Sequence, residues 1–283
     1  MTHMQTGGNT SCVEFRDGNH LLICDAGTGI IPLGDALLRQ NEIREITLIL
    51  THYHWDHIAG LPFFMPAFTP GWKINIFGPG QARTDIEAYL ATQMREPFFP
   101  VETDAWLSDV EYIDAGRTQL THGPIHIERF TLRHPSNTYG YRIDMGGKKI
   151  IYASDNELPF PSEGIDEKTE RLGGSEPSSR ETRETDTWRQ AMEYMHGADF
   201  LIHDAQYTKS DYEKKRGWGH SCYIDTVNMA IDAKVKNLYL FHHDPGYDDG
   251  VIDRLHRHSL EIIKERNSGV GCYVSREGGV IEI

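Results

Sequence analysis

A short segment rich in histidine carries the strongest chemical signal in the chain. Between His52 and His57, three imidazoles and one carboxylate lie within six residues. Two histidines two positions apart on an extended turn can converge on one cation, and the Asp-His pair that follows can reach a second cation nearby. A single surface histidine is common, but four potential ligands in this pattern are not. The segment therefore predicts a metal centre that includes His52, His54, Asp56 and His57.

The spacing His-x-His-x-Asp-His resembles the signature of the metallo-β-lactamase superfamily, and later segments match that family in chain order. The run from His134 to Tyr141 is similar to its ribonuclease Z and phosphodiesterase branch. The resemblance implies two metal sites that share a bridging carboxylate: His52, His54 and His134 on the first ion, Asp56, His57 and His242 on the second, and Asp155 between them. His243 would lie just outside this ligand set.

The type of ligand bears on the metal and the reaction. Imidazole and carboxylate groups suit Zn²⁺, and they would also accommodate Mn²⁺ or Fe. Two such ions about 3.5–4 Å apart would bridge a hydroxide and stabilise the attacking and leaving oxygens of an in-line displacement at phosphorus. The expected ligands include no cysteine, unlike those of some zinc β-lactamases. Asp56 beside His57 fits the phosphodiesterase branch, so we place Asp56 in the catalytic set.

A second pair of segments resembles ribonuclease Z and its cyclic-nucleotide phosphodiesterase relatives. Leu201-Ile-His-Asp-Ala-Gln-Tyr contains Asp204, and Gly217-Trp-Gly-His-Ser contains His220. In that branch an acidic residue orients the histidine, which raises its basicity so that it can protonate a departing alkoxide. Taken alone, Asp204 could cap a strand and His220 could belong to a turn; the metal ligands favour the catalytic pair. Cys222 is not needed as a nucleophile, because the metal site already supplies one.

The elements that must position these residues alternate between short strands and helices. The nearly continuous apolar run 46–50 predicts a strand buried on both faces, and the histidine segment follows its carboxyl end. Other strands are predicted at 12–15, 20–24, 73–77, 110–113, 125–133, 139–144, 148–153, 200–202 and 238–241, helices at 32–40, 82–94, 187–196, 223–233 and 251–264, and a hairpin around Gly278. This pattern predicts an α/β or α+β fold. The family resemblance implies an αββα sandwich.

Two stretches depart from this pattern. Residues 161–186 contain only Ile165 and Leu172 as large apolar side chains, so we expect a mobile polar loop within a single domain, 1–283. The runs around Gly7 and Asp25 resemble the early hairpin of the family, with Asp25 supporting the ligands. Family members carry one more strand before this hairpin. If that N-terminal strand is lacking here, the exposed sheet edge would invite homodimerisation.

Composition excludes several classes of protein. The chain has 283 residues and a formal net charge of −14, which argues against a long nucleic acid as partner. Its apolar runs are shorter than the ~20 residues of a membrane helix, and its start is neither basic nor apolar. The 4 cysteines are scattered. We therefore expect a cytoplasmic protein with reduced thiols and no membrane partner.

These observations favour a dinuclear metal phosphodiesterase acting on a small phosphodiester, with a cyclic nucleotide as the leading substrate. One alternative is a tRNA-processing endonuclease of the ribonuclease Z kind, although the acidic charge counts against it. Another is a carboxyl-ester, lactone or lactam hydrolase. The chain could also be a metal-binding regulator without catalysis. The Asp204–His220 pair argues against a regulator, because a binding protein has no need of a general acid.

Overall fold

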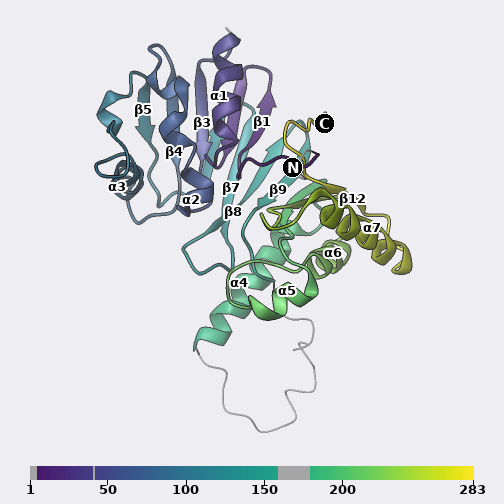
Figure 1. Cartoon of the computed structure of the whole chain (residues 1–283). Helices are drawn as coiled ribbons and strands as arrows, with labels where there is room; N and C mark the ends of the chain where they lie inside the picture. The colour runs from purple at the N-terminus through teal and green to yellow at the C-terminus, as the bar shows by residue number, and fades with distance from the viewer. Residues whose placement is uncertain (1–4, 41, 159–178) are drawn as a thin grey trace. The chain divides into compact units, whose positions relative to one another are not determined.

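The computed structural model describes residues 5–40, 42–158 and 179–283, and the side chains of 179–185 lie outside this description. Its strands form a five-stranded sheet, β1-β2-β3-β4-β5, and a seven-stranded sheet, β12-β11-β10-β9-β8-β7-β6 (Figure 1). The chain divides into two compact units. We call them the N-terminal unit (the described residues up to 129, 139–152 and 276–283) and the C-terminal unit (130–138 and the described part of 153–275). The single domain 1–283 stays a prediction.

The five-stranded sheet of the N-terminal unit begins with an antiparallel hairpin and continues in parallel. Its strands are β1 (Val13–Asp17), β2 (His20–Cys24), β3 (Glu45–Ile49), β4 (Lys73–Phe77) and β5 (Asp109–Tyr112). Gly18, with φ of +57°, allows the tight turn between β1 and β2. The strand β3 pairs in parallel with β2 and β4. This central place explains its continuous apolar sequence, as predicted.

Helical segments supply the rest of the core of this sheet. They are α1 (Ile30–Arg39), α2 (Trp55–Ile58), η1 (Leu61–Phe63), η2 (Met65–Phe68), α3 (Arg83–Gln93) and η3 (Thr103–Ala105). Ile30 and Leu37 of α1 share one buried cluster with Leu48 of β3 and with Phe64. A Cβ on Gly34 would lie 2.9 Å from the Phe64 ring, so glycine permits this close approach.

Two further hairpins belong mainly to the N-terminal unit. The first pairs β6 (Gln119–His122) with β7 (Ile125–Thr131), and the second pairs β8 (Tyr139–Met145) with β9 (Lys148–Ala153). Strand β6 was absent from the sequence prediction. The predicted hairpin around Gly278 is wrong. The last strand, β12 (Gly271–Val274), instead pairs in parallel with β11, and the described residues after it form no strand.

The C-terminal unit has three parallel strands backed by helices. Its elements are α4 (Ser179–Met195), β10 (Phe200–Asp204), α5 (Lys209–Lys214), α6 (Tyr223–Asp232), β11 (Asn237–Phe241), α7 (Asp249–Glu265) and β12. Helix α6 packs on β10 and β11, and α7 packs on α6 and β12 (Figure 1). The carboxyl end of β10 carries Asp204, and that of β11 leads into His242.

Most of the predicted polar loop 161–186 lies outside the described residues. Its last part, from Ser179, belongs to α4, which begins earlier than the predicted helix 187–196. Among the described residues, none of the helices is both long and apolar enough to cross a membrane.

Candidate metal centre and catalytic pair

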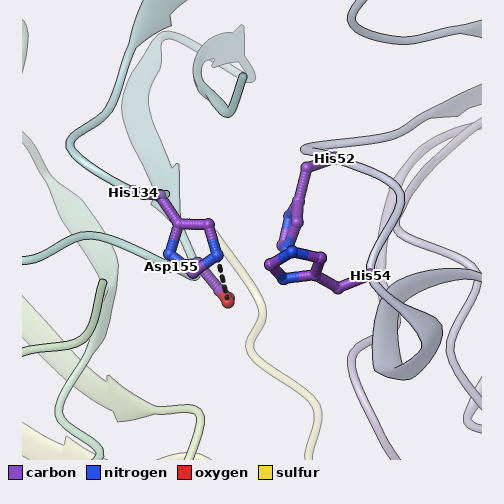
Figure 2. A group of neighbouring side chains, drawn as sticks. All are labelled: His52, His54, His134 and Asp155. Carbon is purple, nitrogen blue, oxygen red and sulfur yellow. Dashed lines mark ion pairs between the residues drawn. The ribbon is translucent and has the colours of Figure 1, made fainter. Parts of the chain in front are cut away.

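The histidine segment follows β3 in the N-terminal unit. His52 and His54 precede the single-turn helix α2, which contains Asp56 and His57. His52 and His57 are fully buried, and their ring centroids lie 4.2 Å apart. The ring centroids of His52 and His54 lie 4.4 Å apart. Figure 2 shows both side chains. Asp56 Oδ2 lies 3.5 Å from His57 Nε2. The structure thus gathers the four predicted ligands of this unit.

The fully buried carboxylate of Asp25 holds this segment in place through hydrogen bonds. Its Oδ1 accepts hydrogen bonds from Thr51 N (2.7 Å) and Thr51 Oγ1 (2.9 Å). Its Oδ2 accepts from His57 Nδ1 (2.9 Å) and from the hydroxyl of Tyr152 (2.8 Å). Because Thr51 Oγ1 donates to Asp25, it accepts from His52 Nδ1 at 3.0 Å. Both imidazoles are therefore held through Nδ1, which makes Nε2 the ligand atom.

Asp155 is the centre of the candidate site in the C-terminal unit. This carboxylate is almost fully buried just after β9. His134 Nε2 lies 3.8 Å from Asp155 Oδ2, the ion pair drawn in Figure 2, and His242 Nε2 lies 3.4 Å from Asp155 Oδ1. His134 Nδ1 donates to the carbonyl oxygen of Gly219 at 2.9 Å. A carbonyl can only accept, so Nε2 of His134 is the atom able to bind a metal.

His242 is held in an uncommon backbone conformation at the end of β11. Its φ of +59° lies in the left-handed region, which costs a non-glycine residue about 1–2 kcal/mol. Strain of this kind is concentrated at functional sites. The ring is stacked on that of His220, with centroids 5.0 Å apart, and Nδ1 lies 3.2 Å from the amide of Gln206. Four ligand atoms of this unit lie within 4.8 Å of one another, one each from Asp155, Asp204, His220 and His242.

Asp204 and His220 form the predicted acid–imidazole pair. His220 Nδ1 donates to Asp204 Oδ2 at 2.7 Å. The Asp204 carboxylate is fully buried and also accepts backbone N–H groups from Gln206 (3.0 Å) and Ser221 (3.1 Å). These donors fix the carboxylate, which in turn fixes the tautomer and orientation of His220. The His220 side chain is 13% exposed. Asp204 engages its Nδ1, so Nε2 is the ring nitrogen that can act on a substrate.

Glu157 is a functional candidate that the sequence prediction missed. Its buried carboxylate accepts hydrogen bonds from Gly217 N (2.8 Å), Gly219 N (3.0 Å) and the Tyr212 hydroxyl (3.2 Å). Gly219 therefore donates its N–H to Glu157 and accepts the Nδ1–H of His134 on its carbonyl oxygen. A Cβ on Gly219 would lie 2.2 Å from His134 Nδ1, so only glycine fits. The signal in the sequence was an acidic residue two positions after a candidate ligand.

Other residues from the sequence analysis fall outside these sets. His243 follows His242, and burial lowers its pKa to about 4, assisted by the neighbouring His242. Burial raises the pKa of the Cys222 thiol to about 11, which opposes a nucleophilic role. The Gly123-Pro124 turn signal in the sequence predicts that the adjacent His122 lies at a surface turn, and this prediction is wrong. This residue is buried, its Nε2 accepts from Leu21 N (3.2 Å), and its Nδ1 faces Thr47 Oγ1 (3.0 Å).

The residues present fit divalent metal ions on the chemistry of their donors. Within each unit, the candidate donors are imidazole nitrogens and carboxylate oxygens. His52, His57 and His134 donate through Nδ1 to an oxygen acceptor. Such hydrogen bonds orient metal-binding imidazoles and strengthen them as ligands.

A comparison with protein families identifies the class of protein. Residues 5–193, two thirds of the chain, match the metallo-beta-lactamase superfamily. The chain belongs to this superfamily and is a metal-dependent hydrolase.

Two curated relatives of similar sequence carry ribonuclease names. Ribonuclease Z of Exiguobacterium sibiricum is 29% identical over 245 residues, which cover 77% of each chain. Ribonuclease BN of Salmonella paratyphi C is 24% identical over 74% of this chain and 73% of its own.

Solved structures show the same fold. YhfI from Bacillus subtilis, a metallo-beta-lactamase fold protein, aligns with a TM-score of 0.67 and 20% identity over 99% of this chain and 98% of its own. A diphosphatase of the PhnP family aligns with a TM-score of 0.60 and 18% identity over 97% and 84%. Human tRNase Z, short form, aligns with a TM-score of 0.57 and 17% identity, over 100% of this chain and 98% of its own. These similarities confirm the mixed α/β fold with two sheets.

Proposed function

We propose that this hydrolase is a dinuclear metal phosphodiesterase that cleaves a small phosphodiester, with a cyclic nucleotide as the leading substrate. The observation that carries the proposal is the His220–Asp204 hydrogen bond of 2.7 Å, in the same unit as the Asp155 and His242 carboxylate–imidazole pair. A proton donor next to metal ligands suits a reaction in which a poor leaving group departs as an alcohol.

The ligand set that we propose is the one that the family resemblance implies. It consists of His52, His54 and His134 for one ion, Asp56, His57 and His242 for the other, and Asp155 as the bridge. When bound, two divalent ions would activate water and neutralise charge on the phosphoryl oxygens. Zn²⁺ is our first choice, and Mn²⁺ or Fe would fit the same donors. Asp25 and Gly219 support this assignment because they hold His57 and His134 with Nε2 as the ligand atom.

His220 supplies the proton for the leaving group. Its Nδ1 is committed to Asp204, so a proton on Nε2 is the one it can deliver to a leaving oxygen. An alkoxide is strongly basic and needs this proton, whereas a nitrophenolate leaves readily without it. The pair therefore favours esters of sugar hydroxyls over thioesters, and it disfavours a regulator without catalysis.

A ribonuclease Z-like endonuclease is the second candidate, and a specific observation favours it. Curated relatives of similar sequence are named ribonuclease Z and ribonuclease BN. Against this stands the net charge of −14, which opposes a long polyanion. A carboxyl-ester, lactone or lactam hydrolase is a third candidate, without such an observation. We retain the cytoplasm as the predicted location.

A substrate panel on the metal-loaded enzyme tests the proposal. It contains cyclic mononucleotides, bis(p-nitrophenyl) phosphate, precursor tRNA, a lactam and a thioester. We expect turnover of a cyclic nucleotide, loss of activity with a chelator, and restoration by Zn²⁺ or Mn²⁺. Cleavage of precursor tRNA without cyclic nucleotides would establish the second candidate instead. Turnover of the lactam or thioester without any phosphodiester would refute both.

A variant pair isolates the proton donor. His220→Ala should slow hydrolysis of the alkoxide-leaving substrate by about 10²–10⁴-fold, the usual worth of general acid catalysis, and the aryl ester far less. The matched control is His126→Ala, because His126 is exposed on β7. Equal losses on the two substrates would remove His220 from the role of acid.

A further inference from the structure

An exposed tryptophan lies two residues before the candidate general acid. The Trp218 side chain is 61% exposed, although tryptophan is usually well buried. Its neighbours Gly217 and Gly219 both have positive φ, +83° and +91°. These two glycines allow the backbone to turn sharply on either side of Trp218. The indole is thereby presented to solvent at the end of the segment that carries His220.

The backbone around Trp218 is firmly held. Glu157 accepts the N–H groups on both sides, from Gly217 and Gly219, and Trp218 N donates to Lys215 O at 3.1 Å. Because a buried carboxylate fixes this turn, the fold sets the backbone position from which the indole projects. A ring carried on an ordered backbone loses less entropy when it binds a planar ligand than a ring on a mobile loop.

A cation and a second aromatic ring lie beside the indole. Lys215 Nζ is 5.9 Å from the Trp218 ring and 4.5 Å from the ring of Tyr207. Asp244 fixes the ammonium with a 2.7 Å ion pair. The buried Tyr207 ring in turn lies 5.8 Å from the ring of His220. Lys215 and Tyr207 thus connect the exposed indole to the general acid.

We propose that Trp218 binds the base of the leaving nucleoside by stacking, with Lys215 holding the indole in place through a cation–π contact. This inference rests on the proposed phosphodiesterase function. His220 protonates the leaving oxygen, so side chains around His220 face the leaving part of the substrate. Two residues span at most about 7 Å of extended chain, and a base attached to the leaving sugar can reach across that distance. Stacking on aromatic rings suits any base.

The test compares a substrate that has a base with one that lacks it. The metal-loaded enzyme and its Trp218→Ala and Trp218→Phe variants are assayed on a cyclic nucleotide and on the same ribose cyclic phosphate without the base. Trp218→Ala should lower kcat/KM for the nucleotide by roughly 5- to 100-fold, mainly through KM, the range that stacking supplies. The abasic substrate should change less than about twofold, and Trp218→Phe should retain most of the activity.

Control variants and contrary outcomes complete the design. Tyr273→Ala removes another exposed aromatic ring of the same unit, on β12, and should affect neither substrate. Lys215→Met should reproduce a smaller base-selective loss. If the wild type cleaves only precursor tRNA, the same comparison is made with and without the base of the leaving nucleotide. An active wild type with equal losses on both substrates, or with none, refutes the stacking site alone. A wild type inactive on every phosphodiester refutes the proposed function, and the site with it.

Discussion

Replacement of Asp25 by Asn tests whether this buried carboxylate sets the geometry of the metal ligands. Asn keeps the shape of the side chain and tolerates the left-handed backbone at this position, where φ is +64°. Its amide nitrogen, however, donates where a carboxylate oxygen accepts. Placed at Oδ1, it would face the N–H of Thr51; placed at Oδ2, it would face His57 Nδ1 and the Tyr152 hydroxyl.

The expected magnitude follows from these contacts. In either orientation at least one buried donor loses its acceptor, which costs about 1–3 kcal/mol. The remaining bonds lose the strength that an ionised acceptor gives them, about half. We expect the free energy of unfolding of the metal-free protein to fall by roughly 2–4 kcal/mol. An amide that donates to His57 Nδ1 also moves the imidazole proton to Nε2, so metal affinity should fall about 10- to 100-fold.

Two measurements separate the effects of the Asp25→Asn variant. Chemical unfolding without metal gives the stability, and competition with a chromophoric chelator gives the metal affinity. Asp35→Asn, on the exposed face of α1, is the matched control and should change neither. A destabilised variant with unchanged metal affinity would reduce Asp25 to a structural role. Unchanged stability would contradict the hydrogen-bond network itself.

Two further predictions concern Glu157 and His122. Glu157→Gln sets an amide nitrogen against the N–H of Gly217 or Gly219. We therefore expect kcat to fall about tenfold or more and the free energy of unfolding to fall by about 1–3 kcal/mol. Steady-state kinetics and thermal unfolding measure the two effects, and an unchanged kcat would contradict the prediction. Burial lowers the pKa of His122 below its ordinary value of 6.5, so the unfolded chain binds more protons and stability is lost as pH falls below 6.5. His122→Gln should flatten this loss in urea titrations between pH 5 and 7, unlike exposed His126→Gln, and an equally steep loss would refute it.

The sequence predicted those parts of the fold whose signals are local. Strand β3 was recognisable from its nearly continuous apolar run. The predicted bounds of β4 and β9 agree residue for residue with the structure. Helix α5 escaped prediction because its six residues are mostly polar, and its stability depends on the Thr208 side chain that accepts from Asp211 N at its start. The error at the C-terminus has a related cause. The glycine turn around Gly278 predicts a hairpin, but β12 instead pairs in parallel with the buried strand β11.

The site divides in the same way. Closely spaced candidate ligands such as His52 and His54 were recognisable because metal-binding residue types occur at short spacing in the sequence. Glu157 was not, because its partners Gly217 and Gly219 are about 60 residues away in the chain. An isolated glutamate predicts a solvated charge, and only tertiary contact supplies the donors that stabilise it when buried. His122 was misjudged for the same reason, since its acceptor role depends on the backbone of Leu21. Groups that hold ligands in place are therefore harder to predict than the ligands, because each needs a partner that the local sequence does not name.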